Sequence, residues 1–292
     1  MADLDGTIVS KRVREYAPAK INLFLEVVGK RADGYHHLQS LMVFCDVGEY
    51  VEVAPAAISQ FTIGGPMASG LMPGNDNLVQ RAAKAFLNAA GLTQPVAIHL
   101  HKDMPVSSGI GGGSADAAAT LRALDLLFNQ PLSRSELLSI SASLGADVPA
   151  CFYSAPMCLN GVGAELTPAD LAIEFSYIVL ANPGVGMSTP AVFTALGAGP
   201  LPQVVPILDS KWTLAACINR RNDLMAPAVA LCPQVQSCLD ALTALPHVRL
   251  ARMSGSGATC FAAFESEHHA ASAVQGLRDR FPEWWIASGA LQ

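Results

Sequence analysis

Apolar and polar residues alternate along the segment PAKINLFLEVVG, residues 18–29. Because successive side chains of a strand point to opposite faces, one face of this segment takes the aliphatic residues. The other face carries Lys20 and Asn22 together, two positions apart. The pattern therefore predicts a strand with one apolar face and two polar groups that can point into the same cleft.

Helical periodicity follows in three segments of the first half, with strand-like stretches between them. The three segments are residues 75–92, Ser114 to about Phe128, and residues 132–149. Asp76 or Asn77 can cap the first segment and Ser114 the second, because a side-chain oxygen at that position accepts from the first free N–H groups. Gly91 and Gly145 are stop signals for the first and third. The first half is therefore predicted to be mixed α+β.

The second half has a different order of elements. Strand-like segments at 175–184, 248–257, 258–265 and 284–291 are separated by helix-like segments at 233–245 and 268–281. Strands and helices in this order predict a ferredoxin-like α/β sandwich. We expect the domain break between Cys158 and Leu171, with domains at residues 1–158 and 159–292.

Composition excludes several classes of protein. The chain has 292 residues, 51% of them hydrophobic and 14% charged, with a formal net charge of −6. This balance indicates a buried core rather than disorder, and the negative charge argues against an extended nucleic-acid surface. No segment has the roughly 20 apolar residues of a membrane helix, and the first residues lack the apolar stretch of a secretory signal. We expect a cytoplasmic protein without a nucleic-acid or membrane partner.

Metal ligation is only weakly indicated. The seven cysteines form no C-x-x-C pair, which favours buried free thiols in a reducing compartment. His99 and His101 alternate onto one strand face, but no third ligand lies nearby in the sequence. We therefore predict no protein metal centre.

The stretch SSGIGGGS, residues 107–114, stands between a predicted strand and a predicted helix. Glycine there leaves backbone N–H groups unshielded, and the start of a helix adds partial positive charge, so the turn can cradle an anion. A Walker loop would require a lysine after the glycines, which is absent, and the spacing does not match the Rossmann fingerprint. A tight turn that only allows close helix–sheet packing remains the structural alternative.

Three motifs together are specific. PVSSGIGGGSADAAATL resembles the central phosphate-loop motif of the GHMP kinase superfamily, PAKINLFLEVVGKRADGYHHLQSLM its first motif, and RMSGSGATCFAAF its third, in the expected order. The resemblance implies a two-domain GHMP kinase fold, with an N-terminal ribosomal-protein-S5-like α/β domain and a C-terminal ferredoxin-like sandwich. RADGYH and LGADVPACF resemble the branch that phosphorylates a cytidine-diphosphate-linked methylerythritol in the non-mevalonate isoprenoid pathway.

The resemblance implies transfer of the ATP γ-phosphoryl group to a substrate hydroxyl, with Mg²⁺ neutralising phosphate charge. It assigns Lys20 and Asp147 as the catalytic pair. It also implies that the glycine loop binds the ATP phosphates. This loop comprises Pro105, Val106, Ser107, Ser108, Gly109, Ile110, Gly111, Gly112, Gly113, Ser114 and Ala115. A second loop of small residues, Ser254–Ala258, is expected to line the phosphate end of the same cleft, although a plain hairpin turn is the alternative.

The family resemblance implies that four residues bind the substrate: Asn22, Tyr35, His36 and Phe193. An aromatic ring can stack on the cytosine and an imidazole can hydrogen-bond its edge. A core position is the alternative for Phe193, and an exposed hairpin for Tyr35 and His36. The chain departs from the family pattern at Ser107, Ser108 and Ile110, and at Asp116, where some members have asparagine.

Two other functions stay open at this level. Another GHMP small-molecule kinase, of homoserine or mevalonate type, would not need the DGYH segment. A non-catalytic nucleotide sensor would not need both Lys20 and Asp147. The expected assembly is a monomer or a homodimer.

Overall fold

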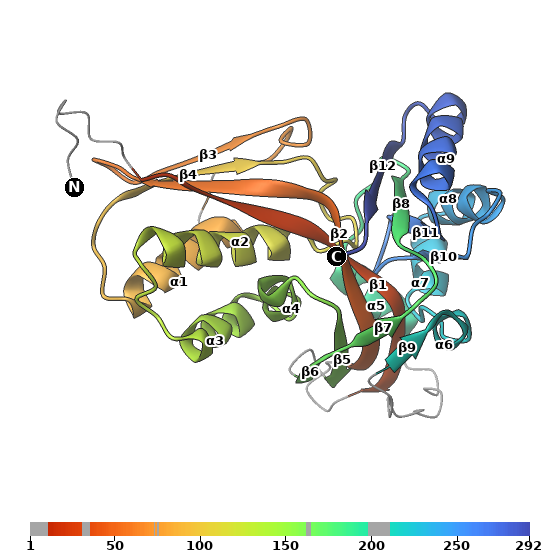
Figure 1. The fold of residues 1–292 in the computed structure, drawn as a ribbon, viewed down its shortest axis with the longest axis horizontal. Coiled ribbons are helices and arrows are strands. Elements are labelled where there is room, and N and C mark those ends of the chain that lie inside the picture. The colour runs from red at the N-terminus through yellow and green to blue at the C-terminus, as the bar shows by residue number, and fades with distance from the viewer. Residues whose placement is uncertain (1–10, 31–35, 73, 75, 162–164, 198–210) are drawn as a thin grey trace. The chain divides into compact units, whose positions relative to one another are not determined.

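The computed structural model describes residues 11–30, 36–72, 74, 76–161, 165–197 and 211–292, which fall into two compact units (Figure 1). The first unit holds the described residues up to Ala17, with 49–103 and 113–152. The second holds 18–48, 104–112 and 153–292. Each unit therefore combines segments that are far apart in the sequence.

Two long strands contribute residues to both units, β1 (Val13–Lys30) and β2 (His36–Pro55). The expected junction between residues 158 and 159 falls inside strand β5 (Met157–Gly161). The two consecutive domains remain a prediction, since the compact units follow three-dimensional contacts rather than chain order.

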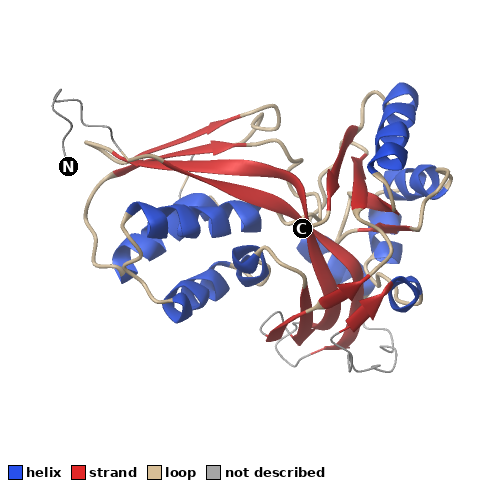
Figure 2. Cartoon of the chain, in the orientation of Figure 1, coloured by secondary structure: helices blue, strands red, loops and turns tan. Residues whose placement is uncertain are grey.

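The first unit is a sheet with helices on one side (Figure 2). Strand β4 (Val96–His101) pairs in parallel with β3 (Gln60–Gly64) and antiparallel with the end of β2, where Tyr50 faces His101. The helices are α1 (Leu78–Ala89), α2 (Gly112–Leu127), α3 (Arg134–Leu144) and α4 (Val148–Tyr153).

The helix limits follow from local side-chain chemistry. Asn77 caps α1 by accepting from the Val79 N–H at 2.9 Å, and α3 ends at Gly145, as predicted. The predicted cap at Ser114 is wrong, because α2 already begins at Gly112. Helix α2 is buried along most of its length, and such tertiary packing outweighs the weak helix propensity of glycine.

The second unit contains the predicted ferredoxin-like sandwich. Its sheet has the strand order β10-β11-β8-β12, with antiparallel neighbours. The strands are β8 (Tyr177–Asn182), β10 (Leu250–Met253), β11 (Cys260–Phe264) and β12 (Trp285–Ala290). Helices α8 (Gln234–Thr243) and α9 (Glu267–Arg280) pack on this sheet (Figure 1). The α+β class is confirmed.

The remaining elements of the second unit are short. They are β5, β6 (Glu165–Pro168), β7 (Asp170–Ala172), α5 (Thr189–Leu196), β9 (Lys211–Thr213), α6 (Leu214–Ile218) and α7 (Met225–Leu231). Strand β5 pairs antiparallel with the first part of β2, where Leu38 lies opposite Gly161.

Both faces of the ferredoxin-like sheet are buried. Val179 and Ala181 face the core that α8 and α9 cover, whereas Ile178 and Leu180 belong to a second core shared with β1. A strand buried on both faces reads as a continuous apolar run, which explains the segment YIVLA. The same second core holds Ile21 of β1.

Candidate active site

Lys20 and Asn22 lie together on β1, as the alternation predicts. The Lys20 Nζ donates to Asn22 Oδ1 at 2.7 Å, and each residue is only 3% exposed. Asn22 Nδ2 in turn donates to Ser40 Oγ at 2.7 Å, and that hydroxyl donates to the Phe24 carbonyl at 2.6 Å. This chain of hydrogen bonds orients the amide of Asn22, so that its oxygen faces the ammonium group.

The carbonyl groups of four consecutive glycine-loop residues are all held by the second unit. Ser107 O accepts from the Met187 N–H at 2.8 Å, and Ile110 O from the Lys20 N–H at 3.0 Å. Ser108 O accepts from the Thr259 N–H at 3.0 Å. Gly109 O accepts from the Ser254 hydroxyl, also at 3.0 Å. The C=O and N–H of a trans peptide point in opposite directions, so each following N–H points away from the group that holds its carbonyl.

Gly109 has a strict steric requirement for glycine. Its φ is +80°, and an added Cβ would lie 2.4 Å from Ser254 O and 2.8 Å from Gly257 N. Gly255, with φ +55°, has the reciprocal constraint, because its Cβ would lie 2.7 Å from Gly109 O. The small-residue loop Ser254–Ala258 therefore packs directly on the glycine loop, backbone against backbone.

Sequence reasoning did not identify Asn222, which holds the small-residue loop in place. Its buried Nδ2 donates to the carbonyls of Met253 and Gly255, each at 2.8 Å, and its Oδ1 accepts from the Leu224 N–H at 3.0 Å. Three hydrogen bonds satisfy this buried amide. The segment NRRNDL carried no signal for that role, because the two carbonyls that Asn222 binds lie about thirty residues away in the sequence.

The last residues of the predicted glycine loop belong to the first unit. Gly113, Ser114 and Ala115 form the start of α2, where a helix exposes free N–H groups. Asp147 is half-buried between α3 and α4, and its carbonyl accepts from the Cys151 N–H at 3.1 Å. Lys20 and Asp147 thus lie in different units.

The predicted base-recognition residues are partly brought together. The His36 ring stacks on Phe193 of α5, with centroids 5.2 Å apart. Burial and the charge of Lys30 lower the pKa of His36, which favours a neutral ring. Its Nε2 is buried and has no hydrogen-bond partner among the described groups. Tyr35 lies outside the described residues.

The remaining features do not add a second site. All seven cysteines are free, and six are buried, as predicted. No group of three or more potential metal ligands occurs in the described part of the chain. Nor does any helix there combine the length and apolar character that a membrane crossing demands.

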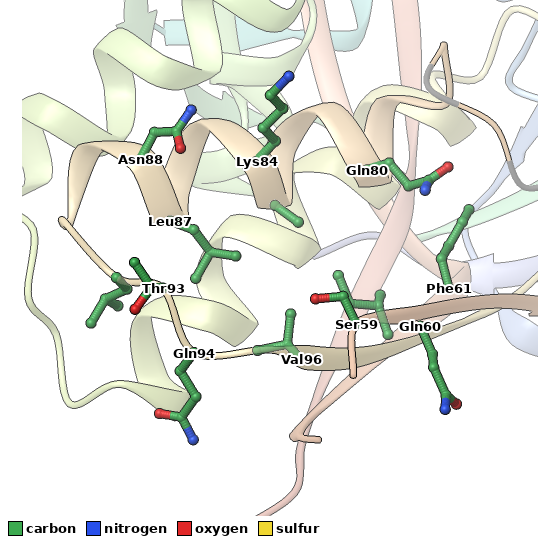
Figure 3. Close-up of a pocket in the computed structure, with 13 residues that line it drawn as sticks. Ser59, Gln60, Phe61, Gln80, Lys84, Leu87, Asn88, Thr93, Gln94 and Val96 are labelled. Carbon is green, nitrogen blue, oxygen red and sulfur yellow. The ribbon is translucent and has the colours of Figure 1, made fainter. Parts of the chain in front are cut away.

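A surface pocket of about 320 Å³ lies between β3, α1 and the start of β4 (Figure 3). Its lining includes Gln80, Lys84 and Asn88 of α1, and Figure 3 shows the amine of Lys84 pointing away from the strands. None of the predicted site residues lines this pocket. The pocket therefore shares no residue with the glycine loop or with the proposed catalytic pair.

Comparison with known proteins identifies the family. Residues 77–155 match the GHMP kinases N terminal domain, and residues 213–283 match the GHMP kinases C terminal domain. A 4-diphosphocytidyl-2-C-methyl-D-erythritol kinase of Cereibacter sphaeroides (strain ATCC 17025 / ATH 2.4.3) is 48% identical over 93% of this chain and 96% of its own. The same kinase of Paracoccus denitrificans (strain Pd 1222) is 46% identical over 95% of this chain and 96% of its own.

Two solved kinase structures are similar to this chain in fold. A crystal structure of 4-(cytidine 5'-diphospho)-2C-methyl-D-erythritol kinase is similar with a TM-score of 0.77 and 32% identity, covering 95% of this chain and 98% of that one. A homoserine kinase from Cytophaga hutchinsonii has a TM-score of 0.71 over 99% of this chain and 98% of its own. At 17% identity, the second likeness shows the fold alone.

Proposed function

The chain belongs to the GHMP kinases, and from that premise we propose that it phosphorylates 4-diphosphocytidyl-2-C-methyl-D-erythritol with ATP. The γ-phosphoryl group goes to the 2-hydroxyl, giving the 2-phosphate and ADP, a step of the non-mevalonate isoprenoid pathway. Several relatives at 42–48% identity over most of the chain carry this kinase's name. In the structure, the proposal is carried by the four anchored carbonyls of the glycine loop.

ATP binding follows from that anchoring. Because neighbouring protein groups already hold the carbonyls of Ser107 to Ile110, the loop has a defined shape before any ligand arrives. Its N–H groups, with those at the start of α2, can then receive phosphate oxygens without a large ordering cost. Because the chain has no Walker lysine, we propose that positive charge at the phosphates comes from Mg²⁺ and from the start of α2.

Lys20 and Asp147 are proposed as the catalytic pair. A substrate hydroxyl becomes a good nucleophile when a carboxylate accepts its proton, and a nearby ammonium favours the developing alkoxide. The hydrogen bond from Lys20 to Asn22 holds the ammonium on β1, on the face shared by both residues. Asp147 is the proposed carboxylate.

His36, Phe193 and Tyr35 are proposed to select the cytidine end of the substrate. The buried Nε2 of His36 lacks a partner among the described groups, and a base edge would satisfy it. The neutral ring can offer either a donor or an acceptor there, according to its tautomer.

Mg²⁺ is proposed to arrive with ATP rather than to occupy a protein cage. The described residues contain no group of three or more carboxylate, histidine or cysteine ligands, and Mg²⁺ commonly keeps water and phosphate oxygens as its main ligands. Bound to the phosphates, it neutralises their charge. Action as a monomer or homodimer, in the cytoplasm and without nucleic acid, also remains part of this proposal.

An ADP-release assay with Mg-ATP tests the function. We expect turnover with the cytidine-linked substrate and none with mevalonate or homoserine; equal turnover with either would favour another GHMP kinase. ATP binding without turnover of any of the three would favour the sensor alternative.

Asp147→Asn tests the proposed base. It should lower kcat by about 10² to 10⁴, the usual contribution of a general base, and leave ATP affinity unchanged. Glu165, an exposed acid on β6, provides a Glu165→Gln control. Near-normal turnover of Asp147→Asn would remove Asp147 from the mechanism without affecting the assignment of the ATP loop.

A further inference from the structure

A buried group of three ionisable residues lies wholly in the first unit, and two of them flank the glycine loop in the sequence. Lys102 follows β4 and precedes the loop, whereas Asp116 follows it in α2. The Lys102 Nζ donates to Asp116 Oδ2 at 2.9 Å and also to Glu49 Oε2 of β2. These three residues, termed the acid–lysine cluster, are at most 4% exposed. None of them belongs to the proposed catalytic pair or to the substrate-selecting residues.

The backbone of Lys102 is fixed as firmly as its side chain. Its N–H donates to Gly64 O at 2.8 Å, and its carbonyl accepts from the Met67 N–H at 3.0 Å. Gly65 allows this approach, because with φ +99° an added Cβ would lie 2.4 Å from Lys102 O. These backbone contacts hold Lys102 in place, so that its amine has a defined position relative to Glu49 and Asp116.

Two carboxyl groups compete for one ammonium in this cluster. Burial, together with the neighbouring charge of Asp116, raises the pKa of Glu49 to about 9, so Glu49 is protonated at neutral pH. The buried Oδ1 of Asp116 has no hydrogen-bond partner among the described groups, and Asp116 is close enough to Glu49 to raise its pKa. With a proton on Glu49, the cluster holds one positive and one negative charge.

The position of Asp116 connects the cluster to the phosphate site. It is the fifth residue of α2, one residue beyond Ala115 and two beyond Ser114. A buried ion pair at this point fixes the rotation and position of the first turn of the helix, where the free N–H groups lie. Lys102 and Asp116 are charged groups that change the pKa of Glu49, Lys102 lowering it and Asp116 raising it.

We propose that Glu49, Lys102 and Asp116 are positioning residues for ATP, which hold the first turn of α2 in register through the hydrogen bonds that Lys102 donates to both acids. This inference rests on the proposed function, since it concerns the amides assigned to the phosphates. It predicts that the affinity for ATP, more than the chemical step, depends on the cluster and on the proton of Glu49.

The test measures the Kd of Mg-ATP by calorimetry and kcat at saturating ATP, from pH 7 to pH 10. For the wild type we expect Kd to rise about tenfold above pH 9, where Glu49 loses its proton and two carboxylates face one ammonium. Glu49→Gln keeps a donor toward Asp116 but cannot ionise, so the alkaline rise should disappear. Glu52→Gln, a half-exposed acid on the same strand paired with Arg12 and Arg14, should retain it.

Lys102→Met should raise Kd at pH 7.5 by at least about tenfold, with kcat at saturating ATP changed much less. If its unpaired Asp116 prevents folding, the double variant Lys102→Met/Asp116→Asn removes both charges and should fold with the same weak ATP binding. An alkaline rise in Glu49→Gln equal to that of the wild type would overturn the inference. So would wild-type affinity in a folded Lys102 variant. Wild-type protein that binds no ATP would instead refute the proposed function.

Discussion

The glycine loop of the second unit and the acid–lysine cluster of the first are held by different physical means. Residues Ser107 to Ile110 are held by neutral hydrogen bonds to their carbonyls and by close backbone packing at Gly109. The start of α2 is held by buried charge, through Lys102 and Asp116. Neutral bonds and sterics do not depend on pH, whereas a cluster with a protonated Glu49 does. The two supports are therefore expected to fail under different conditions.

Gly109→Ala should have the largest effect. A Cβ there meets the Ser254 carbonyl at 2.4 Å with φ at +80°, and together strain and overpacking cost roughly 2 to 5 kcal/mol. We expect a lower Tm and loss of ATP binding by calorimetry. Gly276→Ala in α9 is the matched control, since an added Cβ there would have nothing within 4 Å. Equal losses in both variants would refute the steric assignment.

Asn222→Ala should have the second largest effect on stability and on ATP affinity. It leaves two buried carbonyls and the Leu224 N–H without their donor and acceptor, which costs about 2 to 4 kcal/mol. Chemical denaturation should show that loss, and ATP affinity should fall with it, because the small-residue loop supports Gly109. Asn219→Ala, at an exposed position three residues earlier, should change neither quantity.

Ser254→Ala should have a smaller effect. The Ser254 hydroxyl donates to Gly109 O at 3.0 Å and accepts from the Asn22 N–H at 3.1 Å, and losing such bonds costs about 1 to 2 kcal/mol. The Kd for ATP should rise, independently of pH. Exposed Ser237 of α8 offers a neutral control as Ser237→Ala. A pH-dependent defect in Ser254→Ala would contradict the distinction between the two supports.

The last expected effect is a change in the slope of stability against pH rather than a loss at one pH. Burial first, and Asp116 second, raise the pKa of Glu49 from its ordinary 4.5 to about 9. Between these values the folded state binds more protons than the unfolded state, so this group makes the free energy of unfolding fall as pH rises. Glu49→Gln should flatten that decline in urea titrations between pH 5 and 9, whereas Glu52→Gln should not. An unchanged slope in Glu49→Gln would show that Glu49 is ionised in the folded protein.

Local pattern was sufficient for much of the fold. Alternation placed Lys20 and Asn22 on one face of a strand, and the capping residue Asn77 and the stop at Gly145 gave the limits of helices. The cap at Ser114 was wrong because a run of glycines looks like a loop until its burial is known. In α2 the helix is stabilised by packing that no local pattern reports.

The sequence by itself determined the class of the fold and most of its strands and helices, and it predicts phosphate binding by the glycine loop, because these depend on neighbouring residues. Only the tertiary structure decided which glycine is sterically required. The run Gly111 to Gly113 is the conspicuous feature of the sequence, but Gly109 is the one pressed against Ser254, 145 positions away. The role of Asn222 and the raised pKa of Glu49 are equally non-local, since each depends on groups that only folding brings into contact.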